Sequence, residues 1–315
     1  MDSFALAPFP GLSIPAAMEV VLGETGSNCA LPLLSQRGIR GSEIARTLSL
    51  LPDLPFELGP RGWRLSARPQ RITYQMRALW ESDLEDFERV LTPVIDGVSV
   101  PRPETTLRVV GPWTLACAVE MPNGHRAVTD FGAARELREH LLAGIQGGFD
   151  YVIFCEPAIP ALLEGKVPGA HDFEVIAQRT PEQLARFLEP FAELDVQVVV
   201  HTPGHHSAAH IARLAQLPKA IIDPIHTVGT AILDEWGFAL AQGLEPIFVI
   251  NPLQEARAAA IKLARWIDQL QLPRELLTTT ALTTEHIGQD LTQTARNLAM
   301  VQQCTDMLHR DAGDL

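Results

Sequence analysis

Titratable side chains follow several short apolar segments of this 315-residue chain. Cys155, His201 and Asp223 each end such a segment, and Glu156 follows directly after Cys155. Imidazole, thiolate and carboxylate groups are zinc ligands in proteins, and a carboxylate held in one direction can also act as a general acid or base. These residue types indicate a metal site or an acid–base site, provided that the fold brings the segment ends together.

His201 and Asp223 are the first candidates for metal ligands. Five of the ten histidines fall between His201 and His226, so further ligands can come from this stretch or from the segment before it. The proposed metal set is His201, Asp223, Cys155, His226 and His205. The alternative is that the nearby histidines decorate the exposed start of the next helix, since their spacing matches no standard motif such as HExxH.

Glu156 and Cys155 are the candidates for catalysis. Pro157 follows Glu156 and restricts its backbone, which favours a general acid or base or a group that binds an amine. The alternative for Glu156 is an ion pair with an arginine. Cys155 is a candidate ligand or reactive thiol, and the alternative is a thiol that is simply buried. A neighbouring carboxylate raises the pKa of a thiol and opposes thiolate formation unless a metal is present.

The chain alternates short apolar segments with amphipathic helices. Several segments, such as YVIFC and VQVVVH, are continuously apolar, as expected for a parallel sheet buried on both faces. The eight predicted strands are Phe4–Ala7, Pro55–Leu58, Leu107–Val110, Tyr151–Cys155, Val196–His201, Ala220–Asp223, Pro246–Ile250 and Leu277–Ala281. The predicted helices are Gln75–Leu91, Asp130–Ile145, Thr180–Leu194, Gly229–Gln242, Gln254–Leu270 and Glu285–Leu308.

Eight strands alternating with helices over this length predict the α/β fold class, as a single-domain (β/α)8 TIM barrel over residues 1–315. The alternative is a doubly wound open sheet. No G-x-G-x-x-G turn follows the first strand, so the sequence indicates no nucleotide cofactor. In a barrel the carboxyl ends of all strands meet at one rim, which is where the titratable residues fall.

The composition of the chain limits which binding partners and which cellular compartment we expect for the protein. The formal net charge of −13 gives no general footprint for nucleic acid or an anionic membrane, which leaves a small-molecule substrate. No apolar run reaches the ~18–20 residues that span a bilayer. The four cysteines contain no CxxC pair and are expected to be reduced thiols of a cytoplasmic protein.

An ordered series of short motifs resembles the catalytic C-terminal barrel of the cobalamin-independent methionine synthase family, which shares a superfamily with uroporphyrinogen decarboxylase. The motifs are F-P-G (Phe9–Gly11), G-P-W-T (Gly111–Thr114), C-E-P-A (Cys155–Ala158), V-V-V-H (Val198–His201), I-I-D (Ile221–Asp223) and N-P (Asn251–Pro252). The resemblance implies a single barrel that transfers a methyl group to the thiol of homocysteine, as in methionine biosynthesis, and a zinc ion that activates this thiol. It also implies Phe9, Trp113 and Glu156 as substrate-binding residues.

The site departs from the family pattern at several positions. The family's two zinc cysteines are replaced by Pro203 and Gln254, and Asp223 stands for a glutamate. Cys155 replaces the aspartate of D-E-P-A, and Ala7-Pro8 replaces the Gly-Ser of the first strand. The resemblance therefore implies a degenerate zinc site.

Three functions follow from these residues. The first is a methionine-synthase-like methyltransferase with an altered donor or metal site, for which a methyl-donor protein is a candidate partner. The second is a metal-dependent or acid–base enzyme that acts on a small acidic metabolite. The third is a non-catalytic paralogue.

Overall fold

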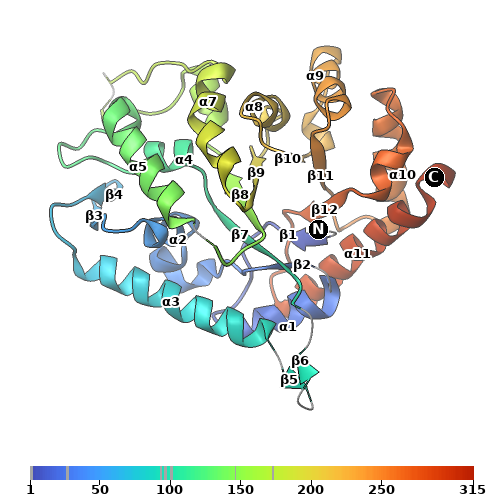
Figure 1. Ribbon diagram of the computed structural model, residues 1–315, viewed down its shortest axis with the longest axis horizontal. Coiled ribbons are helices and arrows are strands. Elements are labelled where there is room, and N and C mark those ends of the chain that lie inside the picture. Colours follow the sequence, from blue (N-terminus) through green and yellow to red (C-terminus); the bar gives the residue numbers. More distant parts are fainter. Residues whose placement is uncertain are drawn as a thin grey trace.

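Eight parallel strands form the centre of the computed structural model, which describes residues 3–25, 28–92, 94–95, 98–99, 102–145, 147–171 and 174–315 (Figure 1). The strands are β1 (Ser3–Ala5), β2 (Asn28–Ala30), β7 (Glu104–Val110), β8 (Tyr151–Cys155), β9 (Gln197–His201), β10 (Lys219–Ile222), β11 (Glu245–Val249) and β12 (Ala281–Thr284). Hydrogen-bonded neighbours follow the order β1-β12-β11-β10-β9-β8-β7-β2. β1 and β2 lie side by side, and Phe9 N donates to Leu33 O (2.8 Å) just beyond their ends, so the sheet closes into a nearly complete barrel.

Helices surround this barrel (Figure 1). They are α1 (Ile14–Thr25), α2 (Glu43–Leu50), α3 (Arg71–Leu91), α4 (Pro112–Ala118), α5 (Phe131–Gly144), α6 (Ile159–Glu164), α7 (Pro181–Leu188), α8 (Ala208–Leu214), α9 (Thr230–Ala241), α10 (Ala256–Gln269) and α11 (Leu291–Asp311). Two hairpins lie outside the barrel sheet: β3 (Phe56–Gly59) with β4 (Gly62–Leu65), and β5 (Val94–Ile95) with β6 (Val98–Ser99). The (β/α)8 barrel expected from the sequence is confirmed.

Local sequence explains where several helices begin. Asp130 caps α5 by accepting a hydrogen bond from Ala133 N (2.9 Å). Thr180 forms a capping box with Gln183 at the start of α7, and Pro181 occupies the first helical position. Within the described residues, no helix has the length and apolarity needed to cross a membrane.

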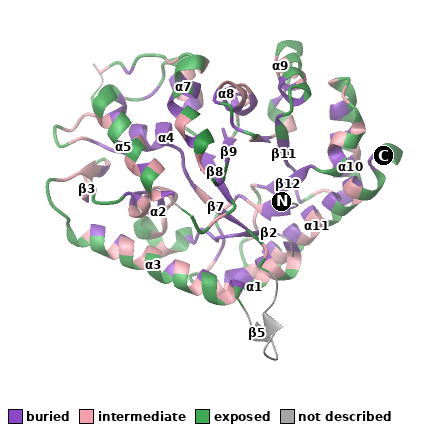
Figure 2. Ribbon diagram, viewed as in Figure 1, coloured by how far each residue is buried: buried purple, intermediate pink, exposed green. Residues whose placement is uncertain are grey.

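Two apolar cores hold the fold together. Figure 2 shows that the strands are the most deeply buried elements of the protein. The larger core packs the helices on the outer face of the barrel. The smaller core fills the barrel interior and includes Phe4, Ile153, Val199, Ile221 and Ile247. Because side chains alternate along a strand, these interior positions fix which residues of each strand point toward the barrel axis.

The structure corrects three predicted elements. Pro55–Leu58 is not a barrel strand, because it overlaps β3 of the outer hairpin, and the second barrel strand is β2 instead. Leu277–Ala281 overlaps a 3-10 turn over Arg274–Thr278, and β12 begins only at Ala281. The last helix begins at Leu291 rather than Glu285. Glu285 therefore directly follows a strand and is not part of a helix.

Candidate active site at the carboxyl ends of the strands

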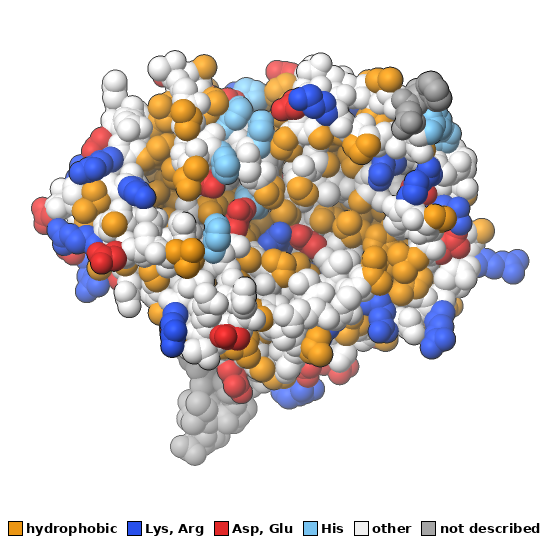
Figure 3. Space-filling view, turned by 180° about the vertical axis from the view of Figure 1, so that it is seen from behind, with side chains coloured by type: hydrophobic (Ala, Val, Ile, Leu, Met, Phe, Trp, Pro, Cys, Tyr) orange, Lys and Arg blue, Asp and Glu red, His pale blue; other side chains and the backbone are white. Residues whose placement is uncertain are grey.

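Cys155, His201 and Asp223 lie at the carboxyl ends of three neighbouring strands, β8, β9 and β10. Each is two positions beyond an interior residue, namely Ile153, Val199 and Ile221, so strand alternation directs all three toward the barrel interior. Figure 3 shows histidine side chains gathered on one face of the molecule, close to acidic and basic side chains in its middle. The carboxyl ends of barrel strands are the usual place for active sites in this fold.

A continuous chain of polar contacts crosses this end of the barrel. His201 Nε2 lies 3.0 Å from Glu285 Oε1, and His201 Nδ1 lies 3.9 Å from Cys155 Sγ. Arg108 Nη2 donates to the same sulfur at 3.3 Å. The guanidinium also forms a bidentate ion pair with Glu43, at 2.8 and 3.0 Å. These five residues come from the ends of β8, β9 and β12, from within β7, and from the first turn of α2.

The contacts define the protonation states of this chain of residues. The hydrogen bond from His201 holds the pKa of Glu285 below its usual range although burial opposes this, so Glu285 is a carboxylate at neutral pH. In the neutral imidazole, a carboxylate at Nε2 favours the tautomer with the proton on Nε2, and Nδ1 is then the acceptor that faces Cys155. Burial raises the pKa of the Cys155 thiol to about 12, and Glu43 also raises it while Arg108 lowers it. The resting thiol is therefore protonated.

The remaining predicted metal ligands form separate contacts. His226 Nε2 lies 3.4 Å from Asp223 Oδ2, and Asp223 Oδ1 accepts a hydrogen bond from Ile225 N (2.9 Å). Burial raises the pKa of Asp223. His205 stacks on His206 with ring centroids 4.2 Å apart, and burial lowers the pKa of His205.

These contacts do not fit a preformed zinc site. Over the described part of the chain, no group of three or more His, Cys, Asp and Glu side chains is arranged to hold a metal. Cys155 Sγ faces a guanidinium, and His201 Nε2 is occupied by Glu285. Zinc at this site stays a prediction.

Glu156 occupies a different place from that of its neighbour Cys155. Its side chain is fully buried and points away from the barrel axis, where it meets the first turn of α4. Oε1 accepts from Trp113 N (3.0 Å), and Oε2 accepts from Thr114 N (2.7 Å) and Thr114 Oγ1 (2.6 Å). Burial raises its pKa to about 7, although these three hydrogen bonds lower it. Glu156 thus joins β8 to α4, and its catalytic role stays a prediction.

Phe9 and Trp113, the other predicted substrate-binding residues, are both buried. Trp113 Nε1 donates to Leu184 O (3.0 Å), and its ring lies 4.3 Å from the ring of Phe187. Substrate binding by either residue stays a prediction.

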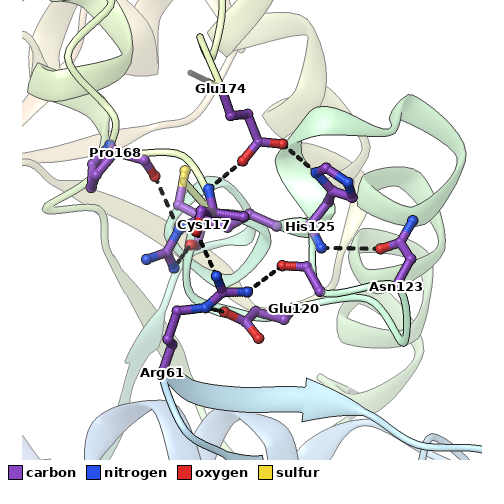
Figure 4. Close-up of polar contacts among 10 residues, drawn as sticks. Arg61, Cys117, Glu120, Asn123, His125, Pro168 and Glu174 are labelled. Carbon is purple, nitrogen blue, oxygen red and sulfur yellow. Dashed lines mark hydrogen bonds and ion pairs between the residues drawn. The ribbon is translucent and has the colours of Figure 1, made fainter. Parts of the chain in front are cut away.

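The loops that follow β7 and β8 are held together by Arg61, which lies at the turn of the β3–β4 hairpin (Figure 4). Its guanidinium pairs with Glu120 (2.7 Å) and donates to Gly124 O (2.6 Å) and Ala170 O (2.5 Å). His125 Nδ1 lies 2.5 Å from Glu174 Oε1 and adds a second link between the two loops. One side of the barrel mouth is therefore fixed by charged contacts.

Three residues of the polar chain were missed by the sequence reasoning: Glu43, Arg108 and Glu285. Glu285 was missed because the preceding strand was placed four residues too early. A strand boundary at T-T-E (Thr283–Glu285) would have placed this carboxylate at the same rim of the barrel as Cys155 and His201. Arg108 is the single charged residue of the predicted strand Leu107–Val110, and a charge in such an apolar segment is an available signal.

The barrel and its polar mouth define the class of this protein as a (β/α)8 barrel with a histidine, thiol and carboxylate site. No family model matches the chain, and no curated protein matches it. Among solved structures, the chain is similar to a B12-independent methionine synthase from Shewanella sp. W3-18-1 in complex with selenomethionine. The sequence identity is 13% and the TM-score 0.45, over 68% of this chain and 64% of that one. The match thus spans less than two thirds of that methionine synthase.

Proposed function

We propose that this chain is a methionine-synthase-like methyltransferase that acts on a small thiol at the carboxyl ends of its barrel strands. The ordered motifs described above support the reaction class, and homocysteine is the first candidate acceptor. We expect the protein to act in the cytoplasm. Its methyl donor is a small methylated compound or a methyl-donor protein.

One observation carries this proposal: His201 is buried at the barrel mouth with Glu285 Oε1 3.0 Å from its Nε2. A thiol must lose its proton to attack a methyl group, and the family uses zinc for this step. Here Nδ1 of His201 is the acceptor that can take the proton, and the Glu285 carboxylate stabilises the imidazolium that forms. The sulfur then attacks the methyl carbon, and the donor leaves with the bonding electrons.

The experiment measures binding first and turnover second. Homocysteine should raise the melting temperature of the purified protein, because a ligand that binds only the folded state stabilises it. Methionine formation is then assayed with methyltetrahydrofolate and with methylcobalamin. His201→Ala should abolish methionine formation, while His140→Ala, on helix α5 of the outer layer, should leave it unchanged. Absence of both a thermal shift and a product would refute the methyltransferase proposal.

The second candidate is an acid–base enzyme for a small acidic metabolite. Arg108 and the rim histidines favour it, since the Arg108 side chain is 17% exposed and can contact a carboxylate at the mouth. A thermal shift with small dicarboxylates but none with homocysteine would favour this candidate over the first.

A further inference from the structure

We infer that Cys155, His201 and Glu285 form a nucleophilic triad that accepts an acyl group from a small ester or thioester. The inference goes beyond methyl transfer, because it makes a side chain of the protein the nucleophile. Three side chains from the ends of β8, β9 and β12 lie in the order thiol, imidazole, carboxylate. This is the order in which a nucleophile, a base and an orienting group act in acyl transfer.

The geometry gives each group one role. Glu285 is 3.0 Å from Nε2 of His201 and holds the tautomer in which Nδ1 is unprotonated. Nδ1 faces Cys155 Sγ at 3.9 Å, a distance that must shorten as the proton moves. Glu285 does not touch the sulfur, so it is a positioning residue. Strand ends supply all three, so little backbone motion is needed to align them.

Arg108 supplies the fourth feature of the site. Its Nη2 lies 3.3 Å from Cys155 Sγ, so a carbonyl oxygen next to the sulfur would meet the guanidinium. A fixed cation at this place stabilises the negative charge that develops on the oxygen. The side chains of Arg108 and Glu285 are 17% and 34% exposed, so the substrate can approach from their side of the mouth.

The reaction balances with water as the co-reactant. Sγ of Cys155 forms a bond to the carbonyl carbon while its proton passes to Nδ1 of His201. The carbon–oxygen or carbon–sulfur bond of the substrate breaks, and the leaving alcohol or thiol takes the proton from His201. Water, with its proton taken by Nδ1, then attacks the thioester carbon. The acid is released, and the proton returns to Sγ.

The other three cysteines provide controls within the same molecule. Cys29, Cys117, Cys155 and Cys304 are all buried, and burial raises the pKa of each thiol to about 12. Neither the burial nor the pKa of its thiol therefore distinguishes Cys155 from the other three cysteines. Within the described residues, Cys155 is the one cysteine that lies at hydrogen-bond distance from an imidazole.

The first test labels the folded protein with iodoacetamide and follows each cysteine by peptide mass spectrometry. Cys155 should be alkylated about tenfold faster than the other three, and His201→Gln should slow its alkylation by about 100-fold. The folded state of each variant is checked by circular dichroism. Equal labelling of all four cysteines, or no effect of His201→Gln in a folded variant, would overturn the triad.

The second test detects the acyl group. Wild-type protein mixed with p-nitrophenyl acetate should release a burst of p-nitrophenol and carry one acetyl group on Cys155 in its intact mass. Cys155→Ser should lose the acetylated thiol, whereas Cys117→Ser should retain the burst. A burst that survives Cys155→Ala would contradict the assignment. Both tests omit homocysteine and a methyl donor, so their outcome is independent of the methyltransferase proposal.

The role of Glu285 is tested by the rate of Cys155 alkylation and by its rescue. Glu285→Gln should slow the alkylation, because the carboxylate that orients the His201 ring is lost, and Glu285→Asp should restore part of the rate. Equal rates in wild type and Glu285→Gln would mean that Glu285 has only a structural role.

Discussion

Replacement of Glu156 by Gln should change how the stability of the protein depends on pH. The carboxylate is fully buried between β8 and α4, and burial raises its pKa from 4.5 to about 7. Because the pKa of the folded state is the higher one, the folded protein retains this proton between pH 4.5 and 7 while the unfolded chain has lost it. The contribution of Glu156 to stability is therefore greatest below pH 4.5 and falls as the pH rises to 7.

The size of the effect follows from this difference in pKa. A change from 4.5 to about 7 corresponds to about 3 kcal/mol, since one pKa unit is worth about 1.4 kcal/mol. Gln cannot accept through its amide nitrogen, so Trp113 N or Thr114 N loses its acceptor at a cost of about 1–3 kcal/mol. Glu156→Gln should therefore be less stable than wild type at pH 5, and this deficit should disappear or reverse by pH 8.

Urea unfolding followed by tryptophan fluorescence at pH 5, 6, 7 and 8 measures this difference. Glu139→Gln is the matched control, since this helix α5 side chain is 57% exposed and its removal should leave the pH dependence unchanged. A constant difference between wild type and Glu156→Gln, within about 0.5 kcal/mol over this range, would refute the reasoning. If Glu156→Gln has wild-type stability but forms no methionine, the catalytic role of Glu156 expected from the sequence would be favoured instead.

Other substitutions test local packing and capping by the same unfolding measurement. Gly111→Ala should destabilise the protein by about 1–3 kcal/mol, because a Cβ there would lie 2.3 Å from Glu156 Oε1. Gly23→Ala, at an exposed position of α1 with no atom within 4 Å of the added carbon, should instead stabilise it by about 0.5–1 kcal/mol. Destabilisation by Gly23→Ala equal to that by Gly111→Ala would contradict the steric argument. Thr180→Ala should cost about 1 kcal/mol by removing the α7 cap from Gln183 N, and an unchanged free energy of unfolding would refute the capping role.

The order of apolar segments predicted most of the barrel. Continuous apolar runs such as Tyr151–Cys155 are typical of strands that a parallel sheet buries on both faces, and that strand has the predicted bounds. Three-residue β2 (Asn28–Ala30) gave no such pattern, because it is short and carries an asparagine. The β3 hairpin was mistaken for a strand of the barrel, since both kinds of strand have similar local sequences.

The sequence also predicted which residue types lie at the site, because Cys155 and His201 stand at the carboxyl ends of their predicted strands. What they contact was decided by the tertiary structure. Alternation along β8 directs Cys155 into the barrel and Glu156 to α4, so two adjacent residues enter different environments. Glu285, 84 positions beyond His201, becomes its partner because closing the barrel brings the ends of β9 and β12 to one mouth. The sequence by itself determines which side chains stand at the ends of the strands. Strand register and barrel closure determine which of these side chains come into contact.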